Sequence, residues 1–296
     1  MKRYRWVLGC CLLLSIGVLW AEDKSDLRAL QQEAAQNRNL DSYVKVCKLL
    51  YQTEEDPDLL LSYADSIHQL AIESRKPEIF IEYYIWLSEG YFIKGDFEQG
   101  YALKRKAIGL AEKAGLRFTI AQACCDMGYY CNADARYDSA RYYFHKGLVA
   151  GEGLPGAEEA CRTILTNYAS SFLFEGQTDS ALVYTIRASE RSAIDKDTAM
   201  LIENLNQLGT IYRRKKNLED CIANFEEALH LCELCGNYNT VAFIYGNIAT
   251  AYCDWDRPED AIPFSEKALK YALKTDNKRR IGTCYVNLGA ILVRME

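Results

Sequence analysis

The chain has 296 residues, of which 49% are hydrophobic and 26% charged, a composition that excludes an intrinsically disordered protein. The formal net charge of -6 argues against a nucleic-acid-binding surface, which would need a basic stripe. Only 5 prolines occur, and no stretch rich in glycine and serine divides the chain, so we expect one continuous body.

The first residues have the pattern of an export signal. Lys2, Arg3 and Arg5 precede an apolar run from Trp6 to Trp20, which is short for a membrane-spanning helix. We therefore predict that residues 1–21 are a signal peptide and that the protein is exported to the periplasm. Leu19 stands where a signal cleavage site prefers a small residue, so an uncleaved membrane anchor is the alternative.

Residues 22–80 are expected to form an N-terminal cap and a degenerate first repeat. A charged helix is predicted over residues 25–37, and a helix pair over residues 41–52 and 57–75. Asp56 and Pro57 suit the N-cap and the first position of the second helix of that pair.

From residue 81 onward the sequence repeats itself. Six segments share the pattern large-x-x-large-small-x-x-large, and each is the first helix of a predicted pair. The small residues at its fifth position are separated by 40, 41, 40, 40 and 40 residues, and they are Ser88, Gly128, Ala169, Gly209, Ala249 and Gly289. Small residues let two helix backbones approach closely, so each unit is expected to be two tightly packed antiparallel helices.

A second pattern follows the first five segments: a small residue, then another seven positions later on the same helix face, as in Ala140 and Gly147. Together these patterns resemble the tetratricopeptide repeat (TPR) family, and the best match is Leu205-x2-Leu208-Gly209-x2-Tyr212 followed by Cys221-x3-Phe225. The resemblance implies an all-α fold, a right-handed superhelical solenoid of antiparallel helix pairs. The predicted repeats are residues 81–120, 121–161, 162–201, 202–241, 242–281 and an incomplete one, 282–296.

Two departures from the usual pattern accompany the resemblance. The period is about 40 residues rather than 34, and the closing proline is absent, which resembles the long TPR arrays of bacterial regulatory proteins. The sixth repeat has only its first helix, so Ile291, Leu292 and Val293 would have no second helix to cover them. We expect either that the chain is part of something longer or that this helix solvates the end of the stack.

The sequence contains no recognisable catalytic motif. The three histidines lie about 80 residues apart, and no phosphate-binding loop, dinucleotide fingerprint or nucleophile elbow occurs. His230, Cys232 and Cys235 are the best metal-ligand candidates, but His230 and Cys232 point to nearly opposite faces of a helix. We therefore predict a protein that is not an enzyme and that has no cofactor and no metal. The ten cysteines after residue 21 are expected to be small apolar core residues.

In TPR proteins the first helices line a concave groove, and the resemblance places the ligand there. The positions two before each small residue are expected to face this groove: Trp86, Asp126, Asn167, Gln207, Asn247 and Asn287. Tyr129, Asn206 and Arg213 are neighbouring candidates. An amide side chain both donates and accepts hydrogen bonds, so it can pair with the backbone of an extended peptide. The alternative is that these amides only bond between adjacent helices.

The resulting hypothesis is an exported scaffold that binds a protein or peptide through its groove. The alternative is the periplasmic sensor region of a membrane-spanning regulator, with a histidine kinase or helix-turn-helix output after residue 296. No nucleic acid partner is expected for this region. A membrane contact is expected only through an uncleaved N-terminal segment or a missing C-terminal part.

Overall fold

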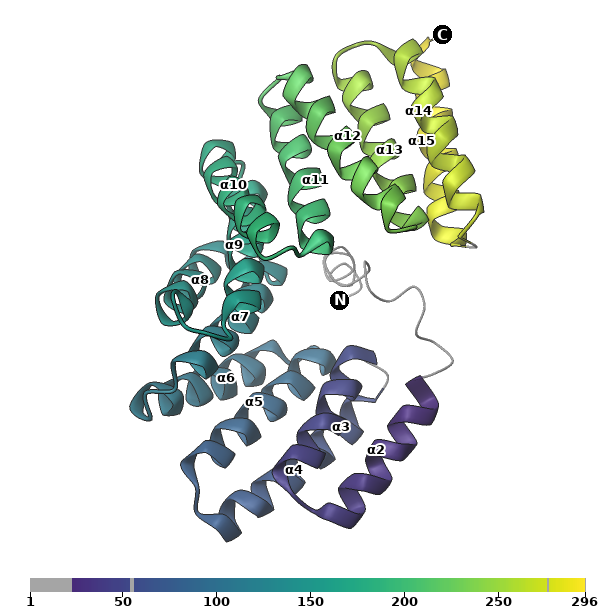
Figure 1. Cartoon of the computed structure of the whole chain (residues 1–296). Coiled ribbons are helices and arrows are strands. Elements are labelled where there is room, and N and C mark those ends of the chain that lie inside the picture. The colour runs from purple at the N-terminus through teal and green to yellow at the C-terminus, as the bar shows by residue number, and fades with distance from the viewer. Residues whose placement is uncertain (1–22, 54–55, 276, 296) are drawn as a thin grey trace. The chain divides into compact units, whose positions relative to one another are not determined.

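The computed structural model describes residues 23–53, 56–275 and 277–295, and every regular element in these ranges is an α-helix (Figure 1). The predicted signal peptide, residues 1–21, lies outside the described residues. The helices are α2 (Asp23–Asn37), α3 (Leu40–Thr53), α4 (Pro57–Ser74), α5 (Pro77–Lys94), α6 (Phe97–Lys113), α7 (Arg117–Ala133), α8 (Tyr137–Gly151), α9 (Glu158–Phe174), α10 (Thr178–Ile194), α11 (Thr198–Arg214), α12 (Leu218–Leu234), α13 (Tyr238–Asp254), α14 (Pro258–Leu273) and α15 (Lys278–Met295).

The described residues form two compact units, divided inside α9 between Ile164 and Leu165. In the first unit α5 packs against α6 and α7 against α8, and in the second α11 packs against α12 and α13 against α14. The prediction of an all-α fold built from antiparallel helix pairs is confirmed. The short helices expected before residue 81 also form, as α2, α3 and α4.

The turn inside each pair has the same backbone conformation, and it recurs with the period of the sequence. One residue per turn has a positive φ: Gly95 (82°), Ala135 (56°), Gly176 (77°), Lys216 (58°) and Asp256 (57°). The residue after it donates its backbone N–H to a carbonyl of the preceding helix, as from Asp96 to Tyr91 (2.9 Å) and from Asn217 to Tyr212 (3.0 Å). These are helix-ending bonds of the Schellman type, and they turn the chain back into the second helix.

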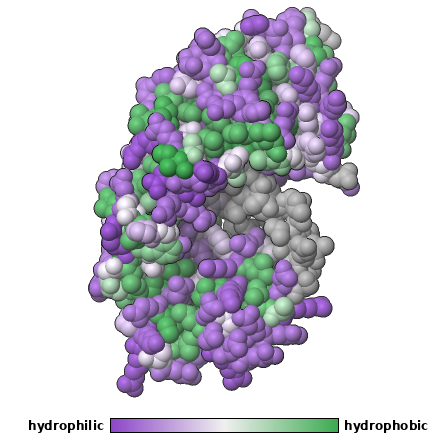
Figure 2. Space-filling model, in the orientation of Figure 1, coloured by the Kyte–Doolittle hydropathy of each residue, from purple (hydrophilic) through white to green (hydrophobic). Residues whose placement is uncertain are grey.

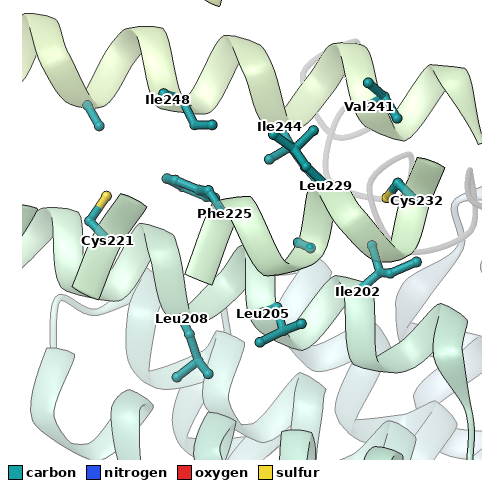
Figure 3. Close-up of a cluster of buried hydrophobic side chains, with 12 residues drawn as sticks. Ile202, Leu205, Leu208, Cys221, Phe225, Leu229, Cys232, Val241, Ile244 and Ile248 are labelled. Carbon is teal, nitrogen blue, oxygen red and sulfur yellow. The ribbon is translucent and has the colours of Figure 1, made fainter. Parts of the chain in front are cut away.

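Within a pair, size complementarity decides how the two helices meet. A Cβ atom added to Gly209 in α11 would lie 2.6 Å from the ring of Phe225 in α12, sixteen residues later. Gly128 in α7 and Phe144 in α8 have the same relationship. The aromatic ring therefore fills the space that the missing side chain leaves. Figure 3 shows Phe225 lying between α11 and α13 among the apolar side chains of the second unit.

The core of each unit consists of the buried faces of these amphipathic helices. In the second unit it includes Leu205, Phe225 and Ile244, and in the first it includes Leu50, Leu60 and Trp86. Figure 2 shows hydrophilic side chains over much of the visible face, with apolar ones between them. In the described part of the chain no helix is both long and apolar enough to cross a membrane.

Candidate functional site

The first unit contains a buried cluster of charged side chains. Lys104 of α6 forms an ion pair with Glu89 of α5, and the side chains are 0% and 3% exposed. The Nζ atom of Lys104 also lies 3.4 Å from a carboxylate oxygen of Asp126 on α7. The hydroxyl of Tyr130 donates a 2.5 Å hydrogen bond to the other oxygen of Glu89. Three helices therefore contribute to one polar network inside the apolar core.

The electrostatics of this cluster depend on burial and on the ion pair. Burial raises the pKa of Glu89 above its usual value, although Lys104 acts in the opposite direction. Burial by itself would lower the pKa of Lys104, but Glu89 and Asp126 outweigh it and hold that pKa above its usual value. Burial also raises the pKa of Tyr130. Lys104 is thus kept charged, and Tyr130 is kept as a hydrogen-bond donor.

The cluster continues along α5. The indole N–H of Trp86 donates a 3.0 Å hydrogen bond to Glu82, and burial raises the pKa of the Glu82 carboxyl. The ring of Trp86 packs edge-on against Tyr51 of α3, with 6.5 Å between ring centroids. Because Glu82 and Glu89 are seven residues apart, they lie on the same face of the helix.

The register of the repeat explains how a lysine comes to be buried here. Lys104 occupies the position that holds Phe144 in α8 and Phe225 in α12, sixteen residues after the small residue of the first helix. Where that small residue is Ser88 instead of glycine, a long flexible side chain replaces the ring. The sequence analysis missed Lys104 and Glu89. A lysine at a position that elsewhere holds phenylalanine was the signal that could have found them.

In the second unit a polar ladder links successive helices. The hydroxyl of Thr185 donates to Gln207 Oε1 (3.0 Å), and Gln207 Nε2 donates to Ser170 (2.8 Å). Asn204 is buried and donates through Nδ2 to Ser192 (3.1 Å). These bonds join α9, α10 and α11, and they use both polar atoms of Gln207.

Asn206 and Asn247 are brought together by the packing of α11 against α13. Asn247 Nδ2 donates a 2.8 Å hydrogen bond to Asn206 Oδ1, and both residues are half-buried. Farther along the same two helices, Arg213 lies 3.6 Å from Asp254. Asn287, the next residue in this register, lines an open pocket of about 180 Å³ between α13 and α15.

The remaining predicted groove residues have different surroundings. Trp86 is buried in the core of the first unit, and Asn167 is buried as well. Asp126 belongs to the charged cluster. Tyr129 is half-buried, and its ring packs edge-on against Tyr130. The structure therefore places Asp126 and Tyr129 beside the cluster of the first unit, and Asn206, Asn247 and Arg213 together in the second.

These side chains offer hydrogen-bond donors, acceptors and charged groups. Among the described residues, no group of three or more His, Cys, Asp and Glu side chains is arranged to hold a metal ion. The ten described cysteines are free thiols, and burial raises the pKa of several of them, that of Cys47 and Cys124 to about 12. A thiol with such a pKa is a poor nucleophile at neutral pH.

Comparison with known proteins agrees with this architecture. Residues 200–274 match the family model of the tetratricopeptide repeat. This segment therefore consists of tetratricopeptide repeats, and the resemblance predicted from the sequence is confirmed there. A search of the curated proteins finds no match to the chain.

Several solved structures share the fold. Apo RapI is 14% identical with a TM-score of 0.69, and the match covers 92% of this chain and 80% of RapI. BtubC from P. vanneervenii is 17% identical with a TM-score of 0.61, covering 75% of this chain and 92% of BtubC. A Rap protein in complex with Competence and Sporulation Factor is 13% identical with a TM-score of 0.52, covering 92% and 85%. At these identities the similarity concerns the fold alone.

Proposed function

We propose that the protein is a non-enzymatic scaffold that binds an extended segment of a partner protein or peptide across α11 and α13. The observation that carries this proposal is the Asn206–Asn247 pair. Its single hydrogen bond uses one donor of Asn247 and one acceptor of Asn206. The Nδ2 group of Asn206 and the Oδ1 atom of Asn247 are left with no partner among the described residues. One free donor beside one free acceptor matches what the backbone of an extended peptide offers.

The side chains around Asn206 and Asn247 also favour this pair as the place where a peptide binds. Thr210 and Thr250 lie one turn beyond the asparagines and donate to carbonyls of their own helices, so their hydroxyl oxygens can still accept. Arg213 and Asp254 lie farther along, where they could orient a charged side chain of the ligand. Gln207, by contrast, has both polar atoms engaged within the unit and is excluded from the proposed surface.

Peptide display tests the proposal. Random peptides would be selected on the immobilised chain, and the strongest would be synthesised and titrated against the wild type and the Asn206→Ala/Asn247→Ala variant. We expect the double variant to bind at least about tenfold more weakly, because two hydrogen bonds are lost. Asn224→Ala is the matched control, since the Asn224 amide bonds to a carbonyl of its own helix α12. Equal affinity for the double variant, or no selected peptide, would contradict the proposal.

We also propose that residues 1–21 direct export, on the basis of the basic residues and apolar run described above. Expression of the full chain in a Gram-negative host, followed by fractionation and N-terminal sequencing, tests it. Recovery from the periplasm with a new N-terminus near Glu22 is expected. A chain that keeps Met1 and sediments with membranes would favour the uncleaved anchor, and a chain left in the cytoplasm would rule out both.

A further inference from the structure

The helix α15 has two different faces. Cys284 and Ile291, seven residues apart, are buried, and α15 packs on α14 and α13. On another face, Tyr285 is 56% exposed and Leu292 is 49% exposed. This second apolar face, the α15 face, comprises Tyr285, Gly289 and Leu292.

In the other helices of this register the corresponding face is covered. Leu205 of α11 corresponds to Tyr285, and it is only 4% exposed within the core of the second unit. Tyr245 and Tyr252 of α13 correspond to Tyr285 and Leu292, and their rings contact Phe264 of α14, with centroids 6.4 Å and 5.3 Å away. The α15 face therefore continues an interface that the second unit already contains twice.

The glycine at the centre of this face indicates what would cover it. In two of the five complete pairs the small residue at the fifth position of the repeated pattern is glycine, and phenylalanine follows sixteen residues later: Gly128 with Phe144 and Gly209 with Phe225. Where serine or alanine takes the place of glycine, the residue sixteen positions later is not aromatic; these pairs are Ser88 with Lys104, Ala169 with Thr185 and Ala249 with Ser265. Gly289 is a glycine of the first kind, and a Cβ atom added to it would meet nothing within 4 Å.

The charge of α15 adds a second, independent indication. Between Lys278 and Met295 the helix carries four basic residues and no acidic one. Arg280 and Arg294 contact α13, whereas Lys278 is exposed and lies seven residues before Tyr285, on the same face. The helix that covers α11 has the opposite character, since α12 contains five acidic residues and no lysine or arginine. A covering helix of acidic character would complement the basic first turn of α15, where Lys278 lies.

We propose that the α15 face is a docking site for an acidic amphipathic helix of a partner protein, which places an aromatic ring against Gly289. The helix would present a small residue followed four positions later by phenylalanine, the arrangement of Cys221 and Phe225 in α12. This site is distinct from the polar surface at Asn206 and Asn247, and it is recognised by apolar packing and charge rather than by backbone hydrogen bonds.

A peptide copied from α12 is a defined probe for this site. Residues 217–235 would be synthesised with a fluorophore and with Cys221, Cys232 and Cys235 changed to alanine. Its binding to the full chain would be followed by fluorescence anisotropy. Saturable binding is expected, and it should weaken at high salt. The Phe225→Ala peptide is expected to bind at least about tenfold more weakly, because the aromatic anchor is lost.

Two variants of the chain test whether the peptide binds to the α15 face. Gly289→Leu fills the space meant for the ring and is expected to reduce affinity for the peptide at least about tenfold. Gly109→Leu makes the same change on α6, where a Cβ atom also meets nothing within 4 Å, and should leave affinity unchanged. Circular dichroism would establish that both variants fold.

Three outcomes would overturn the proposal. One is the absence of saturable binding, and another is equal binding by Gly289→Leu and the wild type. The third is sedimentation showing that the chain alone is a dimer that Gly289→Leu dissociates. That result would assign the α15 face to a second copy of this chain.

Discussion

Lys104 donates to Glu89 from a fully buried position on α6, and the two side chains form the centre of the charged cluster in the first unit. Removing one partner of a buried ion pair leaves the other charge without compensation, and this costs more than the pair itself contributes. Lys104→Met is therefore expected to lower the free energy of unfolding by about 3–5 kcal/mol. Chemical denaturation measures the effect. Lys104→Met/Glu89→Gln removes both charges and should recover part of the loss; a double variant no more stable than Lys104→Met would contradict the assignment.

The pH dependence of Lys104→Met follows from the Glu89 carboxyl. Burial already raises the pKa of Glu89, and Lys104 is the group that lowers it, so the variant should have a still higher pKa. A carboxyl with a raised pKa contributes stability that is fully present below its unfolded pKa of about 4.3 and is lost as pH rises through the folded value. The stability gap between wild type and Lys104→Met should therefore widen between pH 5 and pH 8. Denaturation curves at both pH values measure it, and a gap that narrows would show that Glu89 is not the destabilising charge.

The contact between Gly209 and Phe225 predicts that no residue larger than glycine fits at position 209. A Cβ atom at Gly209 would lie 2.6 Å from the ring, so Gly209→Ala is expected to destabilise the second unit by about 1–3 kcal/mol. Gly246→Ala in α13 is the matched control, because its Cβ atom would meet nothing within 4 Å. That control should gain about 0.5–1 kcal/mol, since alanine favours a helix more than glycine does. Thermal denaturation of the two variants would compare them, and equal midpoints would contradict this packing.

The turn after α7 contains a residue whose replacement should stabilise the protein. Ala135 has a φ of 56°, in the left-handed region that disfavours residues with a Cβ atom, whereas glycine holds the equivalent positions 95 and 176. Ala135→Gly is expected to raise the free energy of unfolding by about 0.5–1 kcal/mol after the loss of chain entropy is counted. Gly95→Ala should have the opposite effect. Urea titration of both variants tests the pair, and a destabilised Ala135→Gly would contradict the turn geometry.

The cysteines should differ sharply in reactivity. Cys235 is exposed, whereas burial raises the pKa of Cys47, Cys124 and Cys232 to about 12. At pH 8 a thiol of that pKa is only about 0.01% thiolate. Brief alkylation of the native chain, followed by peptide mass spectrometry, should therefore modify Cys235 first. All ten described cysteines should react in denaturant. Rapid labelling of Cys47 in the native chain would contradict the burial.

The sequence alone was sufficient to predict the helix pairs, because small residues that recur every 40 positions leave few other ways to pack two helices. The Gly209–Phe225 contact follows from that spacing, since both residues belong to a local unit. The all-α fold and the TPR family were predicted for the same reason. The identity of the groove residues remains a prediction, but the surroundings of each are now described.

Only the tertiary structure decided which polar side chains are engaged. Gln207 and Asn247 occupy equivalent positions in the sequence, yet Gln207 is fully bonded within its unit and Asn247 retains a free acceptor. The difference arises because Thr185 and Ser170 reach Gln207 from two other helices. The contacts of Lys104 with Asp126 and of Glu89 with Tyr130 likewise join one helix pair to the next. A repeat pattern specifies what is local to each pair, whereas hydrogen bonds and ion pairs between repeats depend on side chains that meet only when the helices stack.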